Sequence, residues 1–152
     1  MAIPNFETLE TFKGSNIRTY VAASKMEKQA DLVNQLYAAE EVSVEESMDT
    51  EEHVFQGMTT KGYIPTVTDY GVSFDIVHTK DDAAFSVLKE AHRNKTTIYF
   101  LQMADYTTGE ATQCRMIITK FSTKFASAGT ITTSIELKPA LGSKVEDITI
   151  TE

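Results

Sequence analysis

The side chains best suited to chemistry are seven carboxylates that fall within thirteen residues, with no Lys or Arg among them. Such a run suits several roles: binding a divalent cation, acting on a substrate, solvating a loop, or repelling another polyanion. Cation sites usually combine carboxylates with a glycine-ordered loop, and this run lacks one. We therefore interpret it first as a charged, solvated surface, with ion binding as an alternative. The carboxylates are Glu40, Glu41, Glu45, Glu46, Asp49, Glu51 and Glu52.

The three histidines and the single cysteine offer little for catalysis. His53, His78 and His92 lack metal-ligand spacing and have no cysteine near them in the sequence, so we interpret them as structural or surface residues. Cys114 alternates with Met116 on one strand face, a pattern that predicts a buried, unreactive thiol. No nucleophile elbow, P-loop or dinucleotide-binding glycine motif is present. The sequence therefore predicts a protein that is not an enzyme and holds neither a cofactor nor a metal.

The composition is that of a globular protein with one domain, residues 1–152. This length suits a single core, and the 41% of hydrophobic and 24% of charged residues are ordinary values. No run approaches the roughly 20 apolar residues of a membrane helix, so we expect no membrane association. No N-terminal secretory pattern is visible, and one cysteine fits folding in a reducing cytosol. The net charge of −8 predicts poor nonspecific binding of DNA, because both molecules are negative.

The first half of the chain has weak local signals. Alternation predicts a strand over 16–22, and a capping-box pattern predicts a short helix over about 25–35. A second strand with one solvated face is predicted over 40–46. Residues 47–70 lack clear periodicity and contain two glycines and a proline, so we expect a long connection there. Connections of this length are uncommon in compact domains and are often functional.

The second half has clearer patterns. Apolar residues recur at helical spacing after a capping aspartate, and strict alternation marks the strands on either side. The fold class predicted from this order is mainly β with one flanking α-helix, arranged as a β-sandwich or partial barrel. Residues 141–152 are polar and are expected to form a loosely ordered C-terminal tail. The predicted elements are a strand at 71–79, a helix at 80–93, and strands at 96–104, 113–125 and 130–138.

The order of these segments carries a resemblance to a known family. The acidic segment SMDTEEHVFQG precedes a connection that contains glycine, then the strand GVSFDIVHT and the helix DDAAFSVLKEAHRNKT. The strand TIYFLQ and the long hairpin QCRMIITKFSTKFASAGTITTSIELKPALG follow. In this order and spacing the chain resembles the major tail protein, or tail tube protein, of long-tailed bacteriophages with non-contractile tails.

The resemblance implies a structural virion protein. Subunits of that family form rings, usually hexameric, that stack into a tail tube with an electronegative channel for genome delivery to the host. DNA passes through without specific binding, and the expected partners are other copies of the chain and the tape-measure, tail terminator and distal tail proteins. The implied location is the phage tail, after assembly in the host cytoplasm. Alternatives are the tube protein of a contractile tail or type VI-like secretion system, and a small β-barrel module that binds a ligand or ion.

The resemblance also implies roles for particular residues. The long connection of the family reaches a neighbouring subunit or ring, so we expect the segment from Asp49 to Tyr63 to become ordered only on assembly. Phe55 and Tyr63 are the expected apolar anchors, although they could equally hold the connection to its own subunit. The interface residues predicted in this way are Asp49, Glu51, Glu52, Phe55 and Tyr63. Those predicted to supply charge to the channel are Glu41, Glu45 and Glu46.

Overall fold

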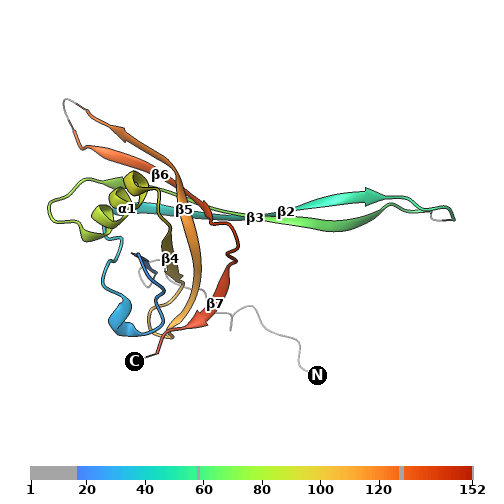
Figure 1. The fold of residues 1–152 in the computed structure, drawn as a ribbon, viewed down its shortest axis with the longest axis horizontal. Coiled ribbons are helices and arrows are strands. Elements are labelled where there is room, and N and C mark those ends of the chain that lie inside the picture. The colour runs from blue at the N-terminus through green and yellow to red at the C-terminus, as the bar shows by residue number, and fades with distance from the viewer. Residues whose placement is uncertain (1–16, 58, 127–128, 152) are drawn as a thin grey trace, which may run out of the picture.

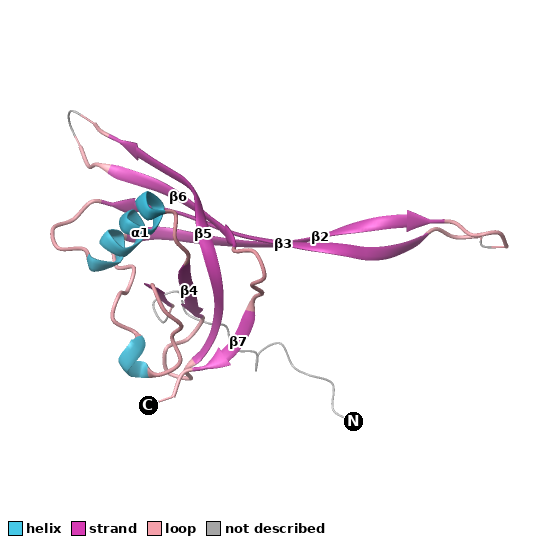
Figure 2. Cartoon of the chain, viewed as in Figure 1, coloured by secondary structure: helices cyan, strands magenta, loops and turns pink. Residues whose placement is uncertain are grey.

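A computed structural model describes residues 17–57, 59–126 and 129–151. The described chain forms one seven-stranded antiparallel sheet with a single α-helix against it (Figures 1 and 2). This confirms the predicted class, mainly β with one flanking helix. The elements are β1 (Arg18–Ala22), the short 3₁₀ helix η3 (Gln29–Asp31), β2 (Ala39–His53), β3 (Gly62–Val77), α1 (Ala83–Asn94), β4 (Ile98–Met103), β5 (Glu110–Lys124), β6 (Thr132–Pro139) and β7 (Glu146–Thr149).

The long strand β5 joins two halves of this sheet. One edge of β5 pairs with β4, and β4 pairs in turn with β1. The other edge pairs first with β7 and then, further along, with β6, which leads on to β3 and β2. We call the part of the sheet formed by β1, β4, β7 and the start of β5 its lower half. Isolated bridges from Gln35 to Tyr20 and from Lys28 to Thr151 connect the segment before β2 to both margins of this lower half. These bridges curl the lower half of the sheet into a partial barrel.

The main core lies between one face of the sheet and α1. Strand alternation sends every second side chain of the central strands to this face, where the helix covers them. Burial of each large apolar side chain contributes roughly 1.5–3 kcal/mol. The residues that meet there include Val72, Phe74 and Ile76 of β3, Ala84, Leu88 and Ala91 of α1, Ile98 and Phe100 of β4, Met116 of β5, and Ile135 and Leu137 of β6.

The ends of α1 are defined by local chemistry. The carboxylate of Asp82 accepts a hydrogen bond from the backbone N–H of Phe85 at 3.3 Å, which caps the first turn. At the other end Lys95 adopts a left-handed conformation with φ of 56°, and its N–H donates to the carbonyl of Ala91. His92 and Arg93 lie in the last turn, where positive charge is favourable. The predicted helix at 80–93 is therefore present, with its start moved to Ala83.

The helix predicted at 25–35 is wrong, because only the three-residue turn η3 forms. Apart from the bonds of this turn, backbone groups of the segment bond to distant parts of the chain. The buried amide of Gln113 accepts from the N–H of Met26 at 2.9 Å and donates to its carbonyl at 3.0 Å. The N–H of Gln29 donates to the carbonyl of Thr151. These long-range bonds outcompete a helix of about ten residues, which is marginal in water without tertiary support.

The structure differs from two further predictions. Residues 47–70 are not an irregular connection, because β2 and β3 continue through most of them as one hairpin. The alternation was invisible in the sequence because both faces of this hairpin lie in solvent and are largely polar. Residues 141–152, expected to be loosely ordered, contain β7, which pairs with β5 from Glu110 to Gln113.

The packing of α1 predicts a large effect of truncating Leu88, which is fully buried. Leu88→Ala is expected to lower the free energy of unfolding by about 2–5 kcal/mol, because it removes apolar contact and leaves a cavity. Glu90→Ala, on the exposed side of the same helix, should change it by less than about 0.5 kcal/mol. Urea denaturation followed by circular dichroism measures both values, and equal losses for the two variants would contradict this core assignment.

Candidate assembly surface

The hairpin of β2 and β3 extends far beyond the rest of the molecule as a two-stranded ribbon (Figure 1). We define the arm as the part of this hairpin from Glu45 to Asp69, and the body as the remainder of the described chain. At about 3.3 Å per residue, a strand running from Glu45 to the turn would reach roughly 35 Å. None of the described arm residues is buried. The arm is therefore a projection that its own subunit does not cover.

Neither edge of the arm has a strand beside it within the described structure. β2 is the last strand of the sheet, and β6 pairs with β3 only from Val72 to Val77. Isolated two-stranded ribbons are marginally stable in water, and open edges are templates for pairing with another chain. Such a ribbon is expected to gain a partner in the functional state of the protein.

Large apolar side chains are exposed along the arm. Tyr63 is 62% exposed and Phe55 63% exposed, and the ring of Phe55 stacks on His53 with centroids 5.6 Å apart. Exposed aromatic and aliphatic groups gathered on one projection are typical of a binding surface. The exposed apolar residues of the arm are Met48, Val54, Phe55, Tyr63, Ile64 and Val67.

The predicted interface residues all lie on the arm, but the strands divide them between faces. Asp49 lies in an irregularity of pairing between Met48 and Thr50, and Glu51 pairs with Ile64 on one face of the ribbon. Glu52 lies on the other face, directly opposite Tyr63 across the ribbon, and pairs with Lys61 at 3.2 Å. Phe55 follows the end of β2. Their participation in an interface remains a prediction, and it would require contact with both faces of the arm.

The predicted channel residues do not share one face either. Glu45 pairs with Gly71 across the ribbon, and Glu46 pairs with Tyr70, whose ring is buried on the core side. Adjacent strand residues point to opposite faces, so Glu45 and Glu46 cannot line the same wall. Glu41 lies in an irregularity of pairing between Ala39 and Val42. Of the three, Glu45 alone is shown to point away from the core.

A polar wall, missed by the sequence interpretation, covers the outer face of β2, β3, β6 and the upper half of β5. This wall faces away from the main core. Within it, the hydroxyl of Ser134 donates a hydrogen bond to the carboxylate of Asp75 at 2.6 Å. The alternation of serine and charged residues with apolar residues in β3 and β6 could have indicated this polar face from the sequence. The charges are nearly balanced, with Lys138 3.6 Å from Asp69 and Lys120 directly opposite Glu136. The wall comprises Ser43, Glu45, Asp69, Ser73, Asp75, Lys120, Ser122, Lys124, Ser134, Glu136 and Lys138.

The residues with catalytic potential have structural roles. His78 Nε2 lies 2.6 Å from the hydroxyl of the buried Thr133, and its ring packs against Phe85. His92 stacks on Phe121. Burial raises the pKa of the Cys114 thiol, and burial likewise raises the pKa of Tyr70 to about 12, so both groups stay protonated near neutral pH. None of these groups forms an activated nucleophile.

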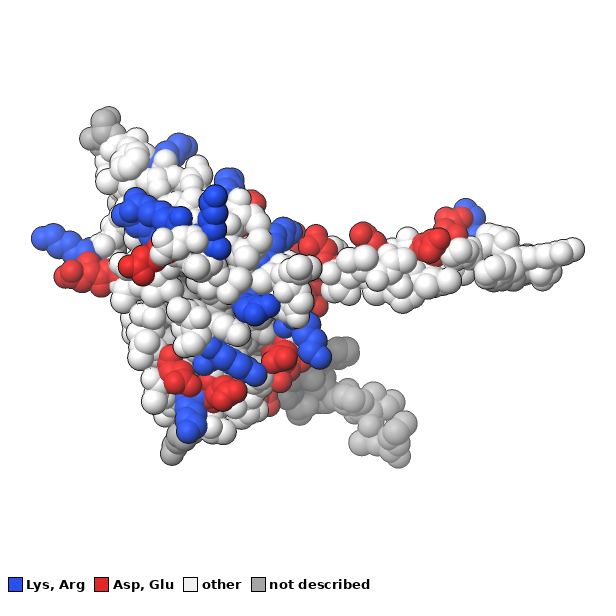
Figure 3. Space-filling view, in the orientation of Figure 1, with Lys and Arg blue, Asp and Glu red and all other residues white. Residues whose placement is uncertain are grey.

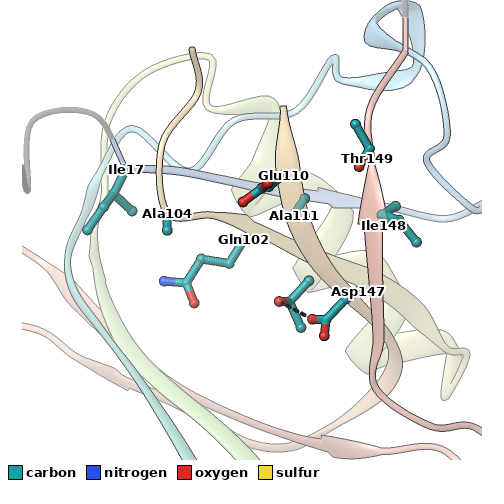
Figure 4. A pocket seen from close by; sticks show the side chains of 9 residues that line it. Ile17, Gln102, Ala104, Glu110, Ala111, Asp147, Ile148 and Thr149 are labelled. Carbon is teal, nitrogen blue, oxygen red and sulfur yellow. Dashed lines mark hydrogen bonds between the residues drawn. The ribbon is translucent and has the colours of Figure 1, made fainter. Parts of the chain in front are cut away.

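One cavity of the body, of about 670 Å³, lies beside β7 and the end of β4 and is lined by Ile17, Gln102, Glu110 and Asp147 among others (Figure 4). Among the described residues, no group of three or more His, Cys, Asp and Glu side chains converges as metal ligands would. No helix in the described part of the chain is long and apolar enough to cross a membrane.

Solved structures that superpose on this chain include tail and tube proteins. The chain superposes on the SPP1 tail tube protein with a TM-score of 0.71 over 93% of this chain and 81% of that chain, at 14% identity. A chain from the tail of an empty gene transfer agent particle gives 0.69 over 88% and 98%, at 9% identity. A chain of the sheath-tube complex of the PVC extracellular contractile injection system gives 0.60 over 94% and 95%, at 12% identity. No family model and no curated protein matches the chain. The protein has the tail tube fold.

The exposed arm predicts a state-dependent rate of hydrogen exchange. Amides of the arm, from Asp49 to Tyr63, should exchange quickly in the free protein, because an uncovered ribbon opens often, and slowly once copies assemble. Hydrogen exchange with mass spectrometry on free and assembled protein measures this difference. Amides of β4 should be protected in both states, and identical arm exchange in the two states would refute the prediction.

Burial of Cys114 predicts slow chemical modification. The thiolate is the reactive form, so iodoacetamide at pH 8 should label the folded protein far more slowly than the protein in guanidinium chloride. Mass spectrometry reports the modified fraction directly, because the chain has one cysteine. Rapid alkylation of the folded protein would instead support a reactive thiol.

Proposed function

We propose that the protein is a structural tail tube subunit, whose copies join into rings that stack into a tube. The observation that carries this proposal is the uncovered arm on a tail tube fold. A ribbon with two open edges and exposed aromatic groups is an aggregation hazard in a monomer. Contact with neighbouring copies removes that hazard, and contacts between unlike patches naturally close into rings or extend into filaments.

Open edges of the sheet suit a ring. β2 ends the sheet on one side, and β4 covers β5 only as far as Met116, which leaves one edge of β5 beyond that residue without a described strand partner. The strands between these two edges are β5, β6, β3 and β2. Pairing of the two edges between neighbouring copies would join these four strands of each copy into one continuous barrel. A ring of six copies is proposed by analogy with the gene transfer agent tail, which has C6 symmetry.

In such a barrel the polar wall would line the channel. Its four carboxylates and three ammonium groups give it a small net negative charge. A wall without excess positive charge would not hold DNA through counterion release, so the genome could pass through. The proposed location is the tail of a phage particle after assembly in the host cytoplasm, without a membrane. Partners at the tube ends would be terminator and distal proteins, with a tape-measure protein inside.

A tube from a contractile system is the second candidate. Its support is the similarity to the sheath-tube complex of the PVC extracellular contractile injection system and to a chain of the anti-feeding prophage baseplate. The TM-score for the SPP1 tail tube is higher, 0.71 against 0.60, so a tail tube of the SPP1 type is proposed first.

The proposal predicts that purified protein forms rings or tubes at high concentration, alone or with tail initiation proteins, when viewed by negative-stain electron microscopy. Phe55→Ser combined with Tyr63→Ser should shorten or abolish tubes, because it removes the largest apolar groups of the arm. Its melting temperature as a monomer should stay unchanged if these side chains contact another copy.

A matched control is Val33→Ser, which removes an apolar group that is 71% exposed on the body, away from the free edge of β5. This control should assemble like the wild type. Wild-type protein that stays monomeric under every one of these conditions would overturn the proposed function.

A further inference from the structure

The acidity of the chain is concentrated on the arm. The arm holds six carboxylates and one cation, Lys61, which accounts for five of the eight net negative charges. The described body is close to neutral, with thirteen carboxylates and twelve cations. Figure 3 shows this separation, with acidic side chains following the arm and most basic side chains gathered on the body. A charged projection on a nearly neutral body favours contact with a positive surface.

One hollow of the body has the complementary charge. It lies where β4, β5 and the turn after β6 meet, has a volume of about 310 Å³, and is lined by Lys25, Arg115 and Lys144. Glu146 is the one carboxylate among the residues that line it. We call this site the basic hollow.

The cations of the basic hollow are not saturated by their own subunit. Among the described residues Lys144 forms no ion pair, and its side chain is exposed. Arg115 donates from Nη2 to the carbonyl of Leu141, but its Nε is buried without a hydrogen-bond partner. Lys25 lies 3.6 Å from Glu146 and 3.7 Å from Glu27, and these solvent-exposed pairs are weak.

Other surfaces of the body fit the arm less well. The larger cavity in Figure 4 carries the carboxylates of Glu110 and Asp147, which would repel an acidic ribbon. Another group of cations lies on or just after α1 and comprises Lys89, Arg93 and Lys95. None of the cavities described here is lined by these three residues. They provide positive charge without a hollow, and therefore serve as a control.

We propose that the acidic arm of one copy docks across the basic hollow of a second copy. The inference rests on the proposed tube function and adds the receiving site. The arm leads away from its own body, so the hollow of the same copy is out of its reach (Figure 1). The roughly 35 Å reach of the ribbon is enough to span to a neighbour. Carboxylates from Glu46 to Glu52, on the part of the arm beyond the polar wall, meet the three cations, while the exposed apolar groups near the tip cover adjacent surface.

Charge reversal and exchange test the contact. Lys25→Glu combined with Lys144→Glu should raise the protein concentration needed for tube formation at least about tenfold, because like charges would face each other in the interface. Asp49→Lys combined with Glu51→Lys on the arm should have a similar effect alone. Mixing all four substitutions in one chain should restore assembly to within about threefold of wild type. Sedimentation and electron microscopy quantify tubes, and higher salt should weaken wild-type assembly.

The matched control is Lys89→Glu combined with Lys95→Glu, which makes the same change in net charge on or beside α1. It should assemble like the wild type, and circular dichroism checks that every variant folds. Equal impairment by the control and the hollow variant, or no rescue by the four-substitution chain, would overturn the inference while leaving the tube function intact. Failure of the wild type to assemble would instead refute the proposed function itself.

Discussion

The hydrogen-bonded ribbon of β2 and β3 leaves the body with no third strand from the described residues beside it, and the rest of the described structure is organised around that constraint. Within the body, β6 supports β3 from Val72 to Val77, and the buried side chains of this stretch anchor the base of the ribbon to the core under α1. Beyond that stretch each backbone group on the outer edges faces solvent. Within one copy the outer part of the arm has only contacts inside the ribbon, whereas a neighbouring copy can supply both edge pairing and apolar cover.

The base of the arm is held by a small set of contacts. Lys138 on β6 lies 3.6 Å from Asp69, which is on β3 at the base of the arm. Gly71 next to it leaves room for this lysine, since a Cβ there would lie 2.9 Å from the Lys138 Nζ. Thr66 donates to the carbonyl of Asp49 where the ribbon pairing is irregular. These contacts fix where the arm starts, and they leave its outer part to be fixed by whatever it meets.

Sequence reasoning succeeded where one face of an element is buried. Val72, Phe74 and Ile76 alternate because the core takes every second side chain, and Ala84, Leu88 and Ala91 recur at helical spacing because α1 lies on that same core. Cys114 was likewise recognisable from its apolar neighbours. The fold class and the order of elements in the second half followed from these patterns.

The sequence did not predict strand pairing or long-range hydrogen bonds that leave no pattern of apolar residues. The outer hairpin has two solvated faces, so its strands have no apolar period, and the segment around Met26 is held by Gln113, 87 residues away. The two-sided nature of β2 also separates Glu45 from Glu46, which the composition of the acidic run could not show.

The placement of charge follows from the same geometry. A strand that lines a channel exposes alternate residues to it, so an acidic run in sequence cannot become an acidic wall. In this protein the wall carries paired charges of both signs, and the excess negative charge lies mainly on the arm. An arm that is acidic on both faces would repel its counterpart from a neighbouring copy and would be attracted to cations on a body. Repulsion between arms and attraction to the body together favour a head-to-tail arrangement, in which each arm meets a different surface, over a symmetric contact between two arms. Head-to-tail contacts of this kind allow a chain of copies to continue from ring to ring.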